Sequence, residues 1–139
     1  MMLVYGYLLG LIGLAKCNGL PEGSFSWTDA KTHICYEGYW QPAGGKLTAS
    51  LLVFCGDEKP SVGHLPFNTG EFPQSYQLSH DSGPISAYTS FVETVKSTCK
   101  APFKYSSMSY FIYNKQEAKE TMQGWVNDEY RIFEKESCQ

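Results

Sequence analysis

The sequence predicts an α+β domain, with a single helix packed on an antiparallel sheet that starts with an N-terminal hairpin. Three observations lead to this class. One stretch has apolar residues four positions apart, several aromatic and β-branched runs lie between Gly and Pro residues, and the cysteines suggest disulfides. The chain has 139 residues, which suits one small domain with one core.

Residues 1–17 are predicted to be a signal peptide. The run from Leu3 to Ala15 is uncharged and too short to span a bilayer as a helix. Small residues follow, which places cleavage near positions 17–19 and leaves 18–139 as the secreted domain. A buried N-terminal strand or helix and a lipid anchor at Cys17 are the alternatives.

The cysteine count supports secretion. The full chain has five cysteines, and cleavage after Cys17 leaves an even set, which predicts two disulfides in an oxidising compartment. Three pairings are compatible with that set, whose members are Cys35, Cys55, Cys99 and Cys138. None of the spacings is that of a zinc site or a C-x-x-C redox motif, so we predict no metal and no cofactor.

The net charge argues against one class of partner. The full chain carries −3, and removal of Lys16 with the signal makes the mature chain more acidic. An acidic chain does not attract a phosphate backbone, so nonspecific nucleic-acid binding is not expected. We expect a monomer without a membrane partner.

The predicted helix covers residues 43–56. Its apolar positions recur at helical spacing, and Pro42 before it and Gly56 after it suit a helix start and stop. These positions are Leu47, Leu51 and Cys55.

The remaining elements are predicted to be strands and loops. An exposed strand or hairpin is expected at 20–34, a loop at 57–70, and strands at 87–95, 109–114 and 125–138. The charged segment 115–123 is either helical or the long turn of a hairpin.

Several short motifs occur in a familiar order. An A-x-x-x-x-x-C segment from Ala49 to Cys55 is followed by an aromatic-Pro-x-x-Tyr motif at 72–76, then by Tyr113-Asn114, Gly124-Trp125-Val126 and a final cysteine. From Ile34 to Cys138 this order resembles the ribonuclease-like secreted effectors of powdery mildew fungi, which are related in fold to guanyl-specific fungal ribonucleases. His33 departs from the pattern, because that family usually has an aromatic residue there.

The resemblance implies a fold, a disulfide pairing and a biological role. It implies a ribonuclease-like fold with Cys35 joined to Cys138 and Cys55 joined to Cys99. It further implies a secreted virulence effector that is delivered into the host plant cell. There it would bind a host protein, with an intracellular immune receptor as one candidate.

The resemblance also implies that catalysis has been lost. Cleavage of RNA needs a base, an acid and positive charge on the phosphate. Four of the five family positions lack the required chemistry here, namely Phe72, Gln74, Tyr110 and the position near Asp128, whereas Glu93 is a residual candidate. We therefore predict no RNA cleavage, and weak RNA binding at most through stacking on Phe72, Tyr76 and Tyr110.

The three histidines leave a second possibility open. His80 lies four residues after Tyr76 and is the best candidate for a rebuilt site, whereas His33 and His64 belong to no constellation. A lone loop histidine is usually a solvated side chain. The alternatives are a divergent active ribonuclease, with Glu93 as base and His80 as acid, and a small extracellular β-rich carrier. For the carrier, the aromatic residues would line a cavity instead of packing in a core.

Overall fold

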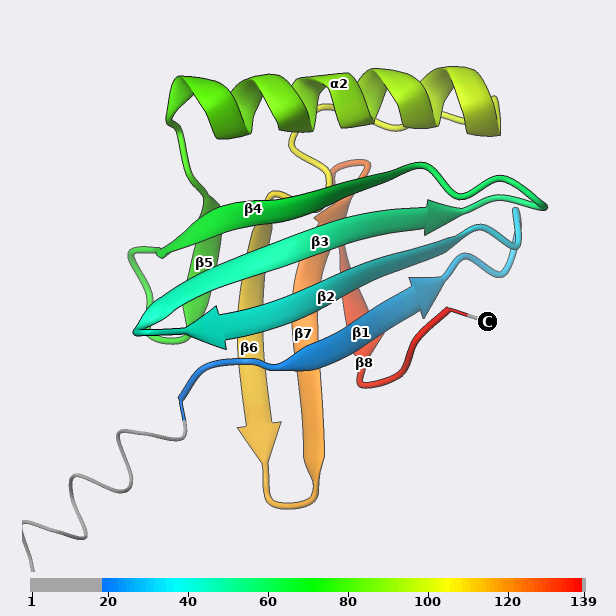
Figure 1. Ribbon diagram of the computed structural model, residues 1–139. Coiled ribbons are helices and arrows are strands. Elements are labelled where there is room, and N and C mark those ends of the chain that lie inside the picture. Colours follow the sequence, from blue (N-terminus) through cyan, green and yellow to red (C-terminus); the bar gives the residue numbers. More distant parts are fainter. Residues whose placement is uncertain (1–18, 139) are drawn as a thin grey trace, which may run out of the picture.

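The computed structural model describes residues 19–138. Eight antiparallel strands follow one another in chain order around a closed barrel, and one helix lies between the fifth and sixth strands (Figure 1). The elements are β1 (Gly23–Thr28), β2 (Cys35–Ala43), β3 (Lys46–Phe54), β4 (Ser61–Thr69), β5 (Ser75–Leu78), α2 (Ser82–Cys99), β6 (Tyr110–Gln116), β7 (Lys119–Val126) and β8 (Glu129–Glu134).

The predicted fold class is wrong. The sheet closes on itself, with β8 returning to β1, so the molecule is a barrel and not an open ribonuclease-like sheet with a helix on one face. The helix is real, but it forms from a different part of the sequence than predicted. The signal-peptide prediction concerns residues outside 19–138.

The segment predicted to be a helix forms β3. Its inward side chains alternate along the strand and are Leu47, Ala49, Leu51 and Val53, all of them buried. A spacing of four is compatible with the strand period of two as well as with a helical turn, and Ala49 and Val53 complete the strand pattern. Gly44 and Gly45 both have positive φ, which gives the tight turn that pairs β3 with β2.

The helix α2 contains the predicted strand 87–95. Its buried residues are Tyr88, Phe91, Val92 and Val95, which are spaced three or four apart and form one face. That face packs against β4, and Lys100 ends the helix in the left-handed conformation. The β-branched content of this stretch favoured a strand, but packing against the barrel determines the helix.

Two other predictions have different outcomes. Residues 61–69 of the predicted loop form β4, in which Gly63 and Pro66 are outward-facing, so neither interrupts the inward pattern. The charged segment 115–123 is the hairpin of β6 and β7, as one of the two alternatives predicted. The strand predicted at 109–114 is confirmed by β6.

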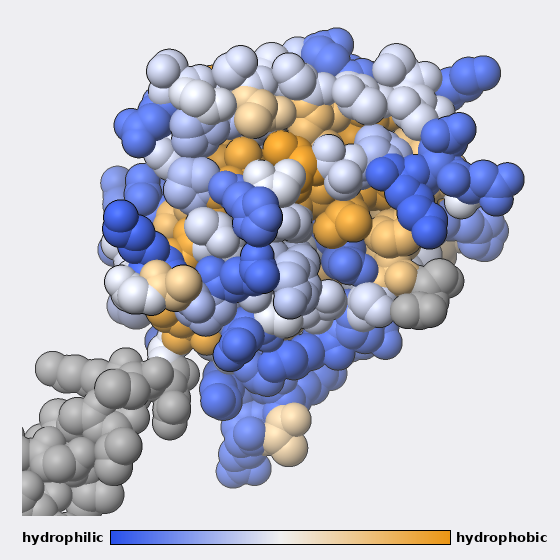
Figure 2. All heavy atoms as spheres, viewed as in Figure 1, coloured by the Kyte–Doolittle hydropathy of each residue, from blue (hydrophilic) through white to orange (hydrophobic). Residues whose placement is uncertain are grey.

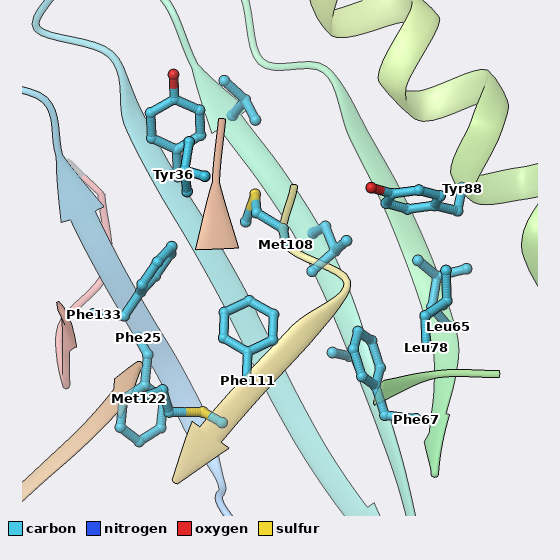
Figure 3. Packing of buried hydrophobic residues seen from close by; sticks show 14 of the residues in the cluster. Phe25, Tyr36, Leu65, Phe67, Leu78, Tyr88, Met108, Phe111, Met122 and Phe133 are labelled. Carbon is cyan, nitrogen blue, oxygen red and sulfur yellow. The ribbon is translucent and has the colours of Figure 1, made fainter. Parts of the chain in front are cut away.

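Aromatic rings fill the middle of the barrel (Figure 3). The ring of Phe111 lies edge-on to Trp40, Phe67 and Phe133, with ring centres 5.0, 6.1 and 5.4 Å apart. Gly124 faces Phe111 so closely that an added Cβ would lie 2.5 Å from the ring. An eight-stranded barrel has room either for packed side chains or for one small ligand, and here side chains occupy the centre.

Both ends of the barrel are covered. At the end nearer α2, here called the helix end, Phe103 packs between Tyr36 and Phe91. At the opposite end, the hydroxyl of Tyr76 donates a hydrogen bond to the carbonyl of Gly19, 3.2 Å away. The N-terminal residues of the described chain therefore lie against the barrel.

Two disulfides fasten the peripheral segments to the barrel. They join Cys35 to Cys138 and Cys55 to Cys99, the pairing that the resemblance implies. The first holds the tail after β8 on the outer side of β2, where the buried carboxylate of Glu37 accepts a hydrogen bond from the Cys138 N–H, 2.6 Å away. The second holds the end of α2 against the end of β3. Two disulfides are compatible with a secreted protein.

Two buried tyrosines make the stability of the protein depend on pH in the alkaline range. Burial raises the pKa of Tyr36 to about 12, helped by the charge of Asp29 and opposed by that of Arg131. Burial also raises the pKa of Tyr88 to about 12, and its hydroxyl donates a hydrogen bond to the Ser107 carbonyl, 2.7 Å away.

We expect the free energy of unfolding to fall as the pH rises from about 10 to about 12, because tyrosine ionises near pH 10 in the unfolded chain. Because the two pKa values are raised in the folded protein, the neutral tyrosines contribute their full stabilisation below pH 10. This contribution is lost as the hydroxyls of Tyr36 and Tyr88 ionise in the folded protein. Urea unfolding across this range measures the fall, and Tyr88→Phe should show a shallower one. An equal fall in Tyr88→Phe would contradict the assignment to Tyr88.

Candidate binding face

A two-residue turn sets the register of β7 and β8. Asn127 and Asp128 both have positive φ, the geometry of the tight turns that join antiparallel strands. The Asn127 side chain anchors this turn, since its oxygen accepts from the Lys104 N–H at 2.8 Å and its nitrogen donates to the Pro102 carbonyl at 3.0 Å. The turn therefore fixes which side chains of β7 and β8 face outward.

The outward side chains of β6, β7 and β8 form an apolar surface. Phe111 of β6 pairs with Gly124 of β7, so extending this register by one residue brings Tyr110 beside Trp125, which pairs with Tyr130. In the next row Ile112 and Ile132 flank Gln123. We call this surface the aromatic face, and its apolar members are Tyr110, Ile112, Trp125, Tyr130 and Ile132.

The aromatic face contains some of the most exposed large apolar side chains. Tyr130 is 45% and Ile132 48% exposed, and the rings of Trp125 and Tyr130 lie 4.0 Å apart between centres. On the side of the barrel seen in Figure 2, apolar side chains also appear below α2, over β3 and β4. The outward apolar residues there are only half-exposed, and they are Leu52 and Phe54 of β3.

The charges near the aromatic face are paired within the chain. At the turn, the ammonium nitrogen of Lys104 lies 2.6 Å from a carboxylate oxygen of Asp128. The guanidinium of Arg131 contacts the carboxylate of Glu129. Farther along β7 and β8, Lys119 pairs with Glu134 at 3.6 Å and Lys135 with Glu120 at 2.8 Å. Pairs this exposed contribute little to stability, but they leave the aromatic face close to electrically neutral.

A pocket of about 270 Å³ adjoins the aromatic face at the start of α2. Tyr110 belongs to both the pocket and the aromatic face. The walls are apolar side chains with hydroxyl, amide and imidazole groups among them, from the residues Gln77, Leu78, His80, Ile85, Tyr88, Ser106, Ser109 and Tyr110. The size and mixed lining suit one side chain or one small molecule.

The structure brings together two of the residues that the sequence singled out, His80 and Tyr110, in this pocket. It separates the others. Phe72 and Gln74 lie in the β4–β5 loop, at the opposite end of the barrel from the turn that contains Asp128. The Glu93 carboxylate lies on the outer side of α2 and accepts a hydrogen bond from the Tyr105 hydroxyl.

The other predicted residues have separate positions. Tyr76 points into the barrel and is 5% exposed, so its ring is not offered to a ligand. His64 is exposed on β4, and His33 lines an open groove of about 880 Å³ beside the Cys35–Cys138 disulfide. The five family positions therefore do not converge on one site in this fold.

A polar cluster at the opposite end of the barrel is internally satisfied. Glu120 accepts hydrogen bonds from the Tyr113 hydroxyl and from Lys135, the latter at 2.8 Å. The hydrogen bond from Lys135 is the main reason that the pKa of Glu120 is lowered, and burial is the main reason that the pKa of Tyr113 is raised. Because these groups satisfy one another, the cluster offers little to a ligand.

Sequence reasoning missed the aromatic face, although it singled out Tyr110 as a residue for base stacking. It predicted one strand over residues 125–138, whereas the end of β7 and the whole of β8 form there. The Asn127-Asp128 pair was the signal that could have corrected this, because a two-residue turn there makes two strands and places Val126 and Phe133 inside.

Comparison with known proteins finds no matching family model, no matching curated protein and no matching solved structure. Within residues 19–138, no cluster of three His, Cys, Asp or Glu side chains could hold a metal ion. In the same residues no helix has both the length and the apolarity needed to cross a membrane.

Proposed function

We propose that the protein acts outside the cell that makes it, as a binding protein that holds a protein partner on its aromatic face. The observation that supports this most is the row of Tyr110, Trp125 and Tyr130 on the outside of a barrel whose inside is already filled. Exposed apolar patches with aromatic residues are typical of interaction sites, and Trp and Tyr are enriched among the residues that dominate binding energy.

The neutrality of the aromatic face indicates the chemistry of the partner. Since the nearby charges are paired within the chain, a strongly charged partner would gain little on contact and would lose hydration. The partner surface should therefore be apolar at its centre and uncharged. The adjoining pocket would accept a single side chain of that partner.

Binding inside the barrel has less support, because aromatic rings occupy the space that a carried ligand would need. The residues expected for RNA cleavage are also not gathered in one place. Virulence-effector activity in a plant host and the lack of RNA cleavage remain predictions of the sequence resemblance.

The proposal can be tested by selecting random peptides displayed on phage against the folded mature protein. We expect selected peptides to bind Trp125→Ala and Tyr130→Ala at least tenfold more weakly, as for residues that dominate an interface. Tyr39→Ala is the matched control, since Tyr39 is an aromatic residue that is 41% exposed on β2. It should bind within about twofold of the parent.

Peptides that bind both face variants as tightly as the parent would overturn the proposal. A selection that yields no peptide would do the same. Circular dichroism and disulfide mapping of each variant confirm that any loss is not caused by unfolding.

A further inference from the structure

The barrel is closed by a very short contact between its first and last strands. All six residues of β1 pair with β2, and all six of β8 pair with β7. Within residues 19–138, β1 and β8 share a single pair, Ser26 with Glu134. The two strands run at a steep angle to each other in Figure 1, so they diverge from this pair toward the helix end.

The register identifies the backbone groups left along this seam. Because a two-residue turn joins β7 to β8, Val126 and Glu129 form the closing hydrogen-bonded pair. Backbone groups alternate sides along a strand, so those of Tyr130, Ile132 and Glu134 point away from β7, toward β1. Only Glu134 has a partner there among residues 19–138, which leaves the N–H and C=O of Tyr130 and Ile132 along an unpaired edge.

Side chains fill the inner side of the seam. Arg131 points inward, and its guanidinium carbon lies 4.7 Å from the centre of the Trp27 ring. An inward-pointing charge is a common means of protecting a strand edge from nonspecific pairing. A strand added at this edge would therefore have room for only a small side chain on its inward side.

The chemistry around the seam argues against a charged side chain at that inward position. Arg131 is already paired with Glu129. Asp29 also lies close enough to this end of the barrel for its negative charge to help raise the pKa of Tyr36. An acidic side chain at that position would compete with Glu129 for Arg131, and a basic one would compete with Arg131 for Glu129, so an uncharged residue is favoured. On the outward side, Tyr130 and Ile132 are exposed and favour apolar neighbours.

We infer that the partner contributes an extended peptide segment, which adds to the β8 edge at Tyr130 and Ile132 and carries apolar residues outward and a small uncharged residue between them. This inference rests on the proposed function, because the apolar residues of the segment would continue onto the aromatic face. Backbone hydrogen bonds would supply affinity and the alternating side chains specificity, as in other complexes formed by strand addition.

The test uses peptides selected on the mature protein and a pair of variants at one position. Ile132→Pro removes the N–H that faces the seam, and it breaks no bond to β7 because that N–H points away from β7. Ile132→Ala is the matched control, since it shortens the same side chain and keeps the N–H. We expect Ile132→Pro to bind the peptides about tenfold more weakly than Ile132→Ala.

A second measurement leaves the protein unchanged. Methylation of alternate backbone nitrogens of a selected peptide should abolish binding at one set of positions and have little effect at the other, because only one edge of an added strand faces β8. The methylation result also tests strand addition if the Ile132→Pro variant does not fold.

The outcomes separate the two proposals. Equal binding by Ile132→Pro and Ile132→Ala, together with tolerance of methylation at every position, would overturn strand addition and leave docking on the aromatic face intact. Insensitivity to Trp125→Ala and Tyr130→Ala would overturn both. A mature protein that is dimeric in solution, and that Ile132→Pro makes monomeric, would assign this edge to a second copy and overturn the peptide inference.

Discussion

Replacing Cys35 and Cys138 together by serine should lower the free energy of unfolding by about 4 to 5 kcal/mol. The bridge joins residues 103 positions apart, and in the loop-entropy model a crosslink over a loop of this length restricts the unfolded chain by about that amount. Domains of this size have a total stability of roughly 5 to 15 kcal/mol, so the loss would be from about a third to nearly all of it.

Urea unfolding of the double-serine variant beside the parent measures this loss. The matched control is the pair Cys55→Ser and Cys99→Ser, whose bridge joins residues 44 positions apart. It should cost about 4 kcal/mol, slightly less than the longer loop. A loss below about 1 kcal/mol for the Cys35 and Cys138 variant would show that fastening the tail does not stabilise the barrel.

Phe111→Ala should lower the free energy of unfolding by about 3 to 5 kcal/mol. The Phe111 side chain is fully buried and lies edge-on to three other rings. It also packs directly against Gly124, where a side chain would collide with the ring. Removing it leaves a cavity at the centre of the barrel, which neighbours held in place by the strands cannot collapse to fill.

The comparison for this prediction is Phe72→Ala. The Phe72 ring is 63% exposed, so its loss should change stability by no more than about 0.5 kcal/mol. Thermal and urea unfolding of both variants provide the measurement. Similar small losses at the two positions would contradict the packed interior described above.

The sequence predicted the locations of several strands better than it predicted the fold. In residues 43–56, apolar positions four apart fit a helix and a strand equally well, and only the pairing of the segment with β2 and β4 decides between them. In residues 87–95, β-branched residues favoured a strand, although the spacing of Tyr88, Phe91, Val92 and Val95 was helical. Barrel closure depends on β1 meeting β8, a contact that local patterns do not encode.

The motif resemblance implied the disulfide pairing that the structure has, but the ribonuclease-like architecture that it also implied is wrong. A bridge from Cys35 to Cys138 brings two distant segments together in many folds, and it does not require an open sheet. The same limit applies to the site. His80 and Tyr110 meet because β5 and β6 are neighbours on either side of the inserted helix, whereas Phe72 and Asp128 belong to loops at opposite ends of the barrel.

The single pair between β1 and β8 has a consequence for biosynthesis. On the secretory route proposed above, the first strand would emerge early, but the strand that closes the barrel against it is made last, and Cys35 has no native partner until Cys138 follows. The Cys55–Cys99 bridge can form sooner, before β6 is complete. Maturation should therefore pass through a singly bridged, open sheet that depends on oxidising enzymes and chaperones until the final strand arrives.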